Sequence, residues 1–337
     1  MLTKTVTNMP ATYELNGNAD ERFQILSLDG GGIKGLFSAA LLSALEDDLK
    51  VRVIDHFDLI AGTSTGGIIA IALGLGLSPR EIVQFYMQHG PAIFPGSSTW
   101  RRCLLQWFRS KYDASPLEAA LKDCFGERRF GESTKRLVIP SYNLGEDDVY
   151  IFRTPHHERL RRDLKVPAWK VARATSAAPT YFPSFRGLDS LRLIDGGVWA
   201  NNPTMVALVE SFGTLGVSLE DTHILSIGTT DALNSRHRKL DRRGKFGWAS
   251  EAIDVVMRGQ TIAARNQAKF LVSEENYWRL DPVVPATEFC LDGIDRTEEL
   301  IAKAAHHSRT LAPTYAKRFA IHLAKPFTAT TPLESQQ

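Results

Sequence analysis

The chain has 337 residues, of which 43% are hydrophobic, and its 40 lysines and arginines nearly balance its 38 aspartates and glutamates. This length and hydrophobic content suffice for the core of one large α/β domain or of two smaller domains. The formal net charge of +2 excludes the strong positive field of a polyanion-binding protein. No nucleic-acid polymer is therefore expected as a partner.

The cysteine spacing and the N-terminal residues indicate the cellular compartment of the protein. Cys103, Cys124 and Cys290 are odd in number and lack Cys-x-x-Cys spacing, which predicts neither a disulfide scaffold nor a zinc cluster. Residues 1–20 contain no continuous apolar segment, and no stretch of the chain is long enough to span a membrane. We expect a cytoplasmic protein that needs no metal.

The first predicted element is a buried strand at 23–28, which runs into a glycine-rich loop at 29–35 and a helix at 36–49. Such a loop directs bare backbone N–H groups at whatever lies on the helix N-terminus. One interpretation is a dinucleotide fingerprint, with Gly30, Gly32 and Gly35 in G-x-G-x-x-G spacing and Asp55 about 20 residues later. A second is an oxyanion hole for an acyl-transfer reaction. A third is a plain glycine turn.

The next stretch, at 57–70, reads as a buried strand, a tight turn and a helix. The turn contains Gly62, Ser64 and Gly66 in G-x-S-x-G spacing. In this setting the pattern predicts a nucleophile elbow, because the glycines permit a strained turn that exposes the serine hydroxyl above the sheet. The alternative is a surface turn without chemistry. An elbow and an oxyanion loop at neighbouring strand ends would work together, and this favours the oxyanion interpretation.

Two Ser-Pro-x-Glu patterns, at 78–81 and 115–118, predict capping boxes that open helices. Between them, the segment 91–111 interleaves tryptophans and leucines with arginines. This composition suits a helix that covers an apolar site or lies on a lipid surface. It equally suits an amphipathic helix packed on the sheet.

Further along, a hairpin is predicted at 136–144 and 148–152, and a small-residue helix ends before Pro179. An apolar strand then delivers Asp195 onto a turn formed by Gly196 and Gly197, at a strand end where parallel sheets build their sites. A strand at 223–228, a basic segment at 233–245, helices near 250–273 and 297–324, and a strand at 277–280 follow. The basic segment is either a solvated loop or a phosphate-binding loop.

Three of these motifs, at 29–35, 62–66 and 195–197, resemble in type and order the signatures of the patatin-like phospholipases. The run Ala-Thr-Ser-Ala-Ala-Pro-x-Tyr-Phe at 174–182 resembles a further block of that family, which would pack beneath the site. The resemblance implies a three-layer α/β/α sandwich with a mainly parallel sheet, in one domain at 20–325. Residues 1–19 and 326–337 would then be loose tails.

The resemblance also implies a mechanism. Ser64 would attack an ester carbonyl and Asp195 would take its proton, without a histidine. The oxyanion would be held by backbone N–H groups of the residues Gly30, Gly31, Gly32 and Thr65. The supporting residues would be Lys34, Gly62, Gly66, Gly196 and Gly197. No cofactor is expected. One of the nine histidines could still complete a triad, because sequence does not exclude proximity in space.

The implied function is hydrolysis of membrane phospholipid at the inner face of the membrane, with transient membrane contact. The motifs and the chain length resemble more closely the bacterial anti-phage effector phospholipases (CapV-like), which are activated by cyclic dinucleotides such as cyclic GMP-AMP. The basic segments at 233–245 and 303–318 could meet such a ligand. The alternatives are a constitutive lipase, a nucleotide-cofactor oxidoreductase and a non-catalytic binding module. A homo-oligomer is compatible with all of them.

Overall fold

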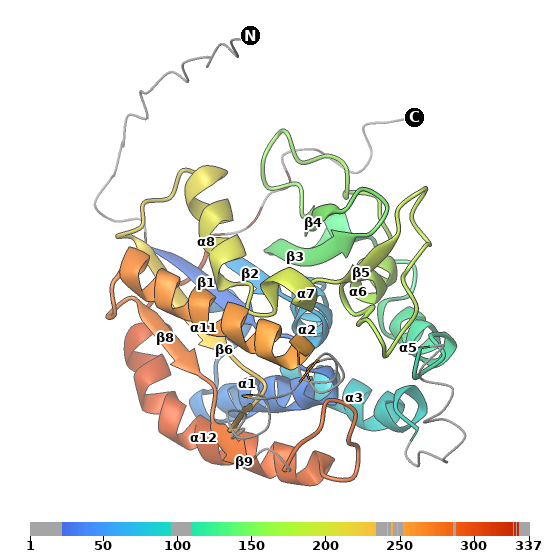
Figure 1. Cartoon of the computed structure of the whole chain (residues 1–337). Coiled ribbons are helices and arrows are strands. Elements are labelled where there is room, and N and C mark those ends of the chain that lie inside the picture. The colour runs from blue at the N-terminus through green and yellow to red at the C-terminus, as the bar shows by residue number, and fades with distance from the viewer. Residues whose placement is uncertain are drawn as a thin grey trace.

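A seven-stranded sheet lies at the centre of the computed structural model, with strands in the order β4-β3-β2-β1-β6-β8 and β5 also paired to β3 (Figure 1). The structure describes residues 22–95, 110–233, 252–285 and 288–325, and the single positions 241, 244, 248, 327 and 329. Neighbouring strands are parallel except at β3, to which β4 and β5 are antiparallel. The strands are β1 (Phe23–Leu28), β2 (Leu59–Gly62), β3 (Arg136–Asn143), β4 (Asp148–Arg153), β5 (Leu193–Asp195), β6 (Thr222–Ile227) and β8 (Tyr277–Leu280), and β7 (Asp231–Leu233) pairs separately with β9 (Val283–Pro285).

Apolar side chains lie on both faces of the sheet, as expected of parallel strands that are covered on both sides. In β1, Leu26 belongs to one buried cluster and its neighbour Ile25 to the other. The two clusters are filled from β2 in the same alternating way, by Ile60 on one face and Leu59 on the other. The continuous apolar runs of the sequence therefore fold as buried strands.

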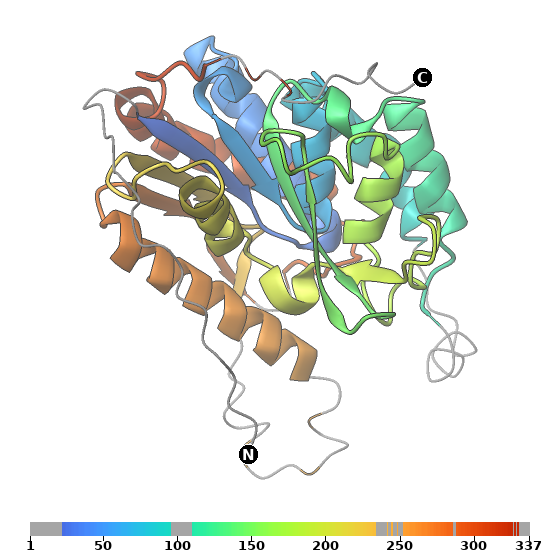
Figure 2. The same ribbon diagram turned by 90° about the horizontal axis from the view of Figure 1, so that it is seen from above.

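Helices cover both faces and complete three layers (Figure 2). The larger cluster packs beneath α1, α2, α3, α5, α6 and α12, whereas the smaller cluster packs beneath α8 and α11. The predicted α/β/α sandwich with a mainly parallel sheet is confirmed. The helices are α1 (Gly35–Leu49), α2 (Thr65–Gly74), α3 (Pro79–Ile93), α5 (Ser115–Phe125), α6 (Ala168–Thr175), α7 (Gly197–Ala200), α8 (Thr204–Gly213), α11 (Ala252–Val272) and α12 (Thr297–Arg318), with 3₁₀ turns at Gly32–Lys34, Val53–His56 and Phe130–Glu132.

Local capping was predicted correctly once and wrongly once. Ser78 accepts from the Glu81 backbone while the Glu81 side chain accepts from the Ser78 backbone, which is the predicted capping box. Ser115 instead is the first residue of α5, and its own backbone and hydroxyl donate to Asp113. The last helix is also shorter than predicted, since α12 ends at Arg318.

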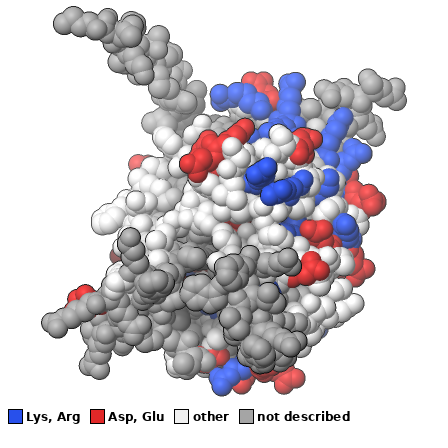
Figure 3. Space-filling model, turned by 45° about the vertical axis from the view of Figure 1, so that its right-hand side comes forward, with Lys and Arg blue, Asp and Glu red and all other residues white. Residues whose placement is uncertain are grey.

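Several predictions lie outside the described residues. They concern the tails at 1–19 and 326–337, most of the segment at 91–111, of which 96–109 is not described, and most of the basic segment at 233–245. Among the helices that are described, none combines the length and apolarity that a membrane span requires. On the face in Figure 3, lysine and arginine side chains gather toward the upper right with acidic side chains among them. That mixture of signs fits the balanced composition.

Candidate active site

Ser64 lies on a strained turn between β2, which ends at Gly62, and α2, which begins at Thr65. Its backbone has φ 54° and ψ −121°, a conformation that costs energy in a residue other than glycine and persists only where neighbours enforce it. A Cβ on Gly62 would lie 2.1 Å from the Gly66 carbonyl oxygen, and one on Gly66 would lie 2.3 Å from the Leu28 carbonyl oxygen. The close approach of three backbone segments therefore requires both glycines of the elbow.

Thr175, the last residue of α6, stabilises this turn. Its hydroxyl oxygen accepts a hydrogen bond from the Ser64 N–H at 3.0 Å and donates one to the Pro140 carbonyl at 2.6 Å. The Thr175 side chain is fully buried. If its hydroxyl were removed, no water could take its place as the partner of the Ser64 N–H. The small-residue block thus packs beneath the site, as predicted, and it also supplies a specific polar support.

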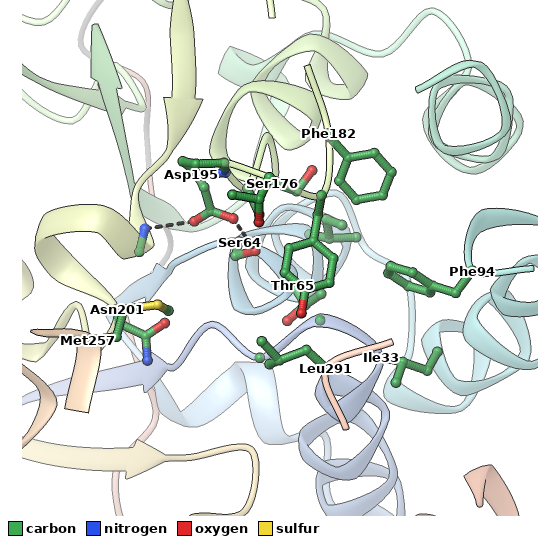
Figure 4. Close-up of a pocket in the computed structure, with 18 of the residues that line it drawn as sticks. Ile33, Ser64, Thr65, Phe94, Ser176, Phe182, Asp195, Asn201, Met257 and Leu291 are labelled. Atoms are coloured by element: carbon green, nitrogen blue, oxygen red, sulfur yellow. Dashed lines mark hydrogen bonds between the residues drawn. The ribbon is translucent and has the colours of Figure 1, made fainter. Parts of the chain in front are cut away.

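Asp195 ends β5 and faces Ser64 (Figure 4). The Ser64 hydroxyl donates to Asp195 Oδ2 at 2.6 Å, and the Gly197 N–H donates to Oδ1 at 2.7 Å. Burial of the carboxyl raises its pKa to about 6, although both hydrogen bonds act in the opposite direction. The carboxyl is therefore mostly ionised at neutral pH yet basic enough to accept a proton.

The glycine loop reaches the same site from the end of β1. Gly31 and Gly32 line the cavity above Ser64. Within the described part of the chain, neither of their N–H groups donates a backbone hydrogen bond, so both can serve an anionic oxygen. Gly32 has φ +58°, and a Cβ there would lie 2.1 Å from the Leu291 carbonyl oxygen, which restricts the position to glycine.

The prediction that the Gly30 N–H contributes to the oxyanion hole is wrong. Its N–H donates to the Asn201 carbonyl oxygen at 3.0 Å. Because that donor is already used inside the protein, it cannot join an oxyanion hole. Thr65 remains at the cavity wall, and as the first residue of α2 its N–H belongs to the unpaired first turn of the helix.

The residues predicted to support the site make contacts within its loops. Lys34 donates from Nζ to the Thr230 carbonyl at 3.0 Å and thereby ties the glycine loop to the segment after β6. A Cβ on Gly196 would lie 2.3 Å from the Pro140 carbonyl oxygen. Gly197 fixes the second oxygen of Asp195. Each contact constrains one of the loops that carry the site.

A cavity of about 560 Å³ opens beside these groups, within the range of ligand-binding clefts. Ser64 and Asp195 lie together on its wall, and most of the remaining wall is apolar or aromatic (Figure 4). Such a cavity accepts a hydrocarbon chain and presents its polar end to the serine. None of the histidines in the described residues lines it. The apolar wall includes Ile33, Ile68, Phe85, Ile93, Phe94, Leu117, Phe182, Met257 and Leu291.

Asn201, which lines the cavity from the segment after α7, was not predicted from the sequence. Its Oδ1 is buried without a hydrogen-bond partner in the described residues, and its Nδ2 makes a 3.4 Å contact to Thr261. Figure 4 shows this oxygen turned to the side of the cavity where Ser64 lies. The pair of asparagines after the Asp-Gly-Gly turn was the available signal.

The dinucleotide interpretation of the glycine loop fails on geometry. Asp55 lies in the Val53–His56 turn, before β2, and its side chain is 44% exposed beside Arg52. The acidic residue of that fingerprint must follow the second strand to reach a ribose. Gly31 and Gly32 instead face the serine cavity. Within the described ranges, no three histidine, cysteine or acidic side chains converge as metal ligands.

The sequence of the chain is similar to those of one known protein family. The family model described as patatin-like phospholipase matches residues 26–208. The chain belongs to the patatin-like phospholipase family. It is accordingly a lipid acyl hydrolase.

Relatives of this patatin-like chain occur in bacteria and plants. The chain is 32% identical over 346 residues to a "cGAMP-activated phospholipase" of Escherichia coli (strain TW11681), covering 92% of this chain and 96% of that protein. It is 35% identical over 242 residues to a protein of the same name from Vibrio cholerae, with 65% of this chain and 67% of the relative covered. "Patatin-like protein 4" of Arabidopsis thaliana is 31% identical over 303 residues, covering 76% of this chain and 75% of that protein.

Proposed function

We propose that Ser64 and Asp195 form a catalytic dyad that hydrolyses the ester bonds of membrane phospholipid, and that a cyclic dinucleotide switches the enzyme on. The observation that carries the dyad is the 2.6 Å hydrogen bond from the Ser64 hydroxyl to a buried carboxylate. The apolar cavity beside it supports an acyl-chain substrate.

In the first step, Ser64 Oγ attacks the ester carbonyl carbon while Asp195 accepts the hydroxyl proton. The carbonyl oxygen becomes an oxyanion, which the N–H groups of Gly31, Gly32 and Thr65 stabilise. Asp195 then returns the proton to the departing alcohol oxygen, and the carbon–oxygen bond to the lysolipid breaks. Ser64 is left as an acyl ester.

In the second step, a water molecule takes the place of the lysolipid. Asp195 accepts a proton from that water, the hydroxide adds to the acyl carbon, and the proton passes to Ser64 Oγ as the acyl–serine bond breaks. A fatty acid leaves and the resting state returns. A pKa of about 6 at Asp195 suits both proton transfers at neutral pH.

The activation part of the proposal draws on the relatives. The Escherichia coli and Vibrio cholerae proteins are both named cGAMP-activated phospholipases. A phospholipase free in its own cell would damage the membrane unless its activity were controlled. We therefore expect low turnover without nucleotide and a sharp increase with one cyclic dinucleotide, as an anti-phage effector requires.

The experiment compares wild type with Ser64→Ala and Asp195→Asn on phospholipid vesicles, with and without a panel of cyclic dinucleotides that includes cyclic GMP-AMP. A fluorophosphonate should label wild type at Ser64 and should not label Ser64→Ala. Activity in either variant above about one thousandth of wild type would contradict the dyad. Full wild-type activity without any nucleotide would contradict the activation.

A further inference from the structure

A second cavity, of about 540 Å³, lies at the outer edge of the sheet between β8, α11 and the end of α12. We call it the edge cavity. Its wall differs in character from that of the serine cavity, because four basic and three acidic side chains line it together with Tyr277 and Trp278. It shares no residue with the serine cavity.

Two arginines of the edge cavity are suited to a phosphate. Arg265 on α11 is exposed and donates from Nε to Asn266 Oδ1 at 3.4 Å, and Arg318 donates to the Glu275 carbonyl. Neither has a carboxylate partner in the described residues, whereas Arg153, Arg173 and Arg279 each pair with one. Planar guanidinium groups that are not paired with a carboxylate recognise phosphate oxygens in two-point contacts.

The same wall offers an aromatic surface. The Arg318 guanidinium lies 5.3 Å from the centre of the half-buried Trp278 ring, and the indole Nε1 is buried with no hydrogen-bond partner among the residues that the structure describes. Bases stack on such rings and on arginine planes. Lys269 completes the basic side of the cavity from α11. The ion pair of Lys269 with the 82% exposed Glu274 contributes little to stability. A phosphate could therefore replace Glu274 as the partner of Lys269.

The edge cavity is connected to the oxyanion loop by Arg279. This side chain lines the cavity and is only 8% exposed. It donates to both oxygens of Asp29, at 3.2 and 2.6 Å, and to Asp281 at 2.7 Å. Asp29 directly precedes the glycine loop at 30–32. A shift of Arg279 would therefore move the residue from which the loop begins.

The helix α11 provides a second connection, extending from α7 toward β8 (Figure 1). Its first part lines the serine cavity through Val256 and Met257, and its later part lines the edge cavity through Arg265 and Lys269. Met257 and Arg265 are separated by eight residues, or about 12 Å along a helix. A rigid helix that contacts both cavities can transmit a displacement from one to the other.

We propose that the edge cavity binds the cyclic dinucleotide, and that binding there controls the Ser64 site through Arg279 and α11. This inference rests on the proposed activation and adds its place and route. The two phosphates contact Arg265, Arg318 and Lys269, and a base stacks on Trp278. The ligand shifts α11 and the glycine loop, and this shift changes how the N–H groups of Gly31 and Gly32 are directed toward Ser64.

The test uses the full chain with cyclic GMP-AMP as the probe. The variant Arg265→Glu/Lys269→Glu reverses the charges of the exposed Arg265 and the half-buried Lys269 in the edge cavity, and the matched control Arg309→Glu/Lys317→Glu reverses two exposed charges on α12 outside it. Binding is measured by calorimetry, and activation as the ratio of vesicle hydrolysis with and without nucleotide. We expect the dissociation constant and the half-activating concentration to increase about tenfold or more in the first variant. The control should change less than about twofold.

Hydrogen exchange in wild type tests the route separately. Bound nucleotide should change exchange at 29–35 and along 252–272 as well as at 277–285. If the first variant binds and responds like wild type, the edge cavity is excluded while the proposed activation stands. If binding is lost in that variant but exchange at 29–35 is unchanged in wild type, the route is excluded. If wild type neither binds nor responds to any cyclic dinucleotide, the inference and the proposed activation both fail, whereas the dyad does not.

Discussion

Asp195→Asn should make the protein more stable at alkaline pH while it removes activity. The carboxyl is 5% exposed, and burial raises its pKa from 3.8 to about 6. The folded protein therefore holds the proton more tightly than the unfolded chain does, so ionisation of Asp195 destabilises the fold. Asparagine keeps both contacts, because its oxygen can accept from Gly197 and its amide can donate to Ser64.

The size of the stability difference between Asp195→Asn and wild type follows from the shift in the pKa of Asp195. A difference of about 2 pKa units, at about 1.4 kcal/mol for each unit, corresponds to about 3 kcal/mol above the folded pKa. For a raised carboxyl pKa, the destabilisation is absent well below the unfolded value of 3.8 and complete above about 6. The advantage of Asp195→Asn should thus be about 3 kcal/mol at pH 8 and less than about 1 kcal/mol at pH 4.

Urea unfolding of wild type and Asp195→Asn across pH 4 to 8 measures this difference directly. Asp221→Asn is the matched control, since this half-buried carboxyl lies outside the serine cavity and its substitution removes the same charge. A stability difference that stays constant with pH, or that favours wild type at pH 8, would refute the account of Asp195 as a strained, ionised base. Inactivity of the variant at every pH completes the expected result.

Three further predictions follow from the same site. The kcat/KM of wild type on a soluble ester should fall about tenfold per unit below pH about 6, because the free enzyme then holds Asp195 protonated; a midpoint that is insensitive to temperature would fit a carboxyl and not an imidazole. Thr175→Val should lower kcat more than it raises KM and should cost about 1–3 kcal/mol in urea unfolding, since the Ser64 N–H loses its buried partner. Gly66→Ala should fail to give folded protein by circular dichroism, whereas Gly213→Ala, where a Cβ meets nothing within 4 Å, should fold normally.

The sequence predicted the strand ends and the residues on them because those features are local. The buried strands, the glycines and the acid at each exit follow one another within a few positions, so pattern and turn chemistry suffice. Parallel strands then bring Ser64 and the glycine loop to one edge of the sheet. The position of Asp195 opposite Ser64 required β5 to pair antiparallel to β3, and only the family resemblance implied it.

The contacts that the sequence did not reveal join residues far apart in the chain. Thr175 supports Ser64 from 111 positions away, and the Gly30 amide is taken by Asn201. In the sequence Thr175 looks like any small residue in a helix, and Gly30 looks like an ordinary member of a glycine run. Their roles depend on how α6 and α7 pack against the sheet, which no local pattern encodes.

Arg279 is a further residue whose contacts could not be predicted from the sequence. It follows two aromatic residues on a short edge strand, where an arginine usually faces solvent. Burial restricts the Arg279 side chain. Its guanidinium contacts two carboxylates and the Ser226 hydroxyl, so it cannot move without leaving charges unpaired in the interior. Such a network has few stable arrangements, and in the proposed activation the bound dinucleotide selects among them. The edge strand contributes Tyr277 to one buried cluster and packs Trp278 against the other, so in the proposed activation a ligand at this strand acts on residues that are fixed to the core.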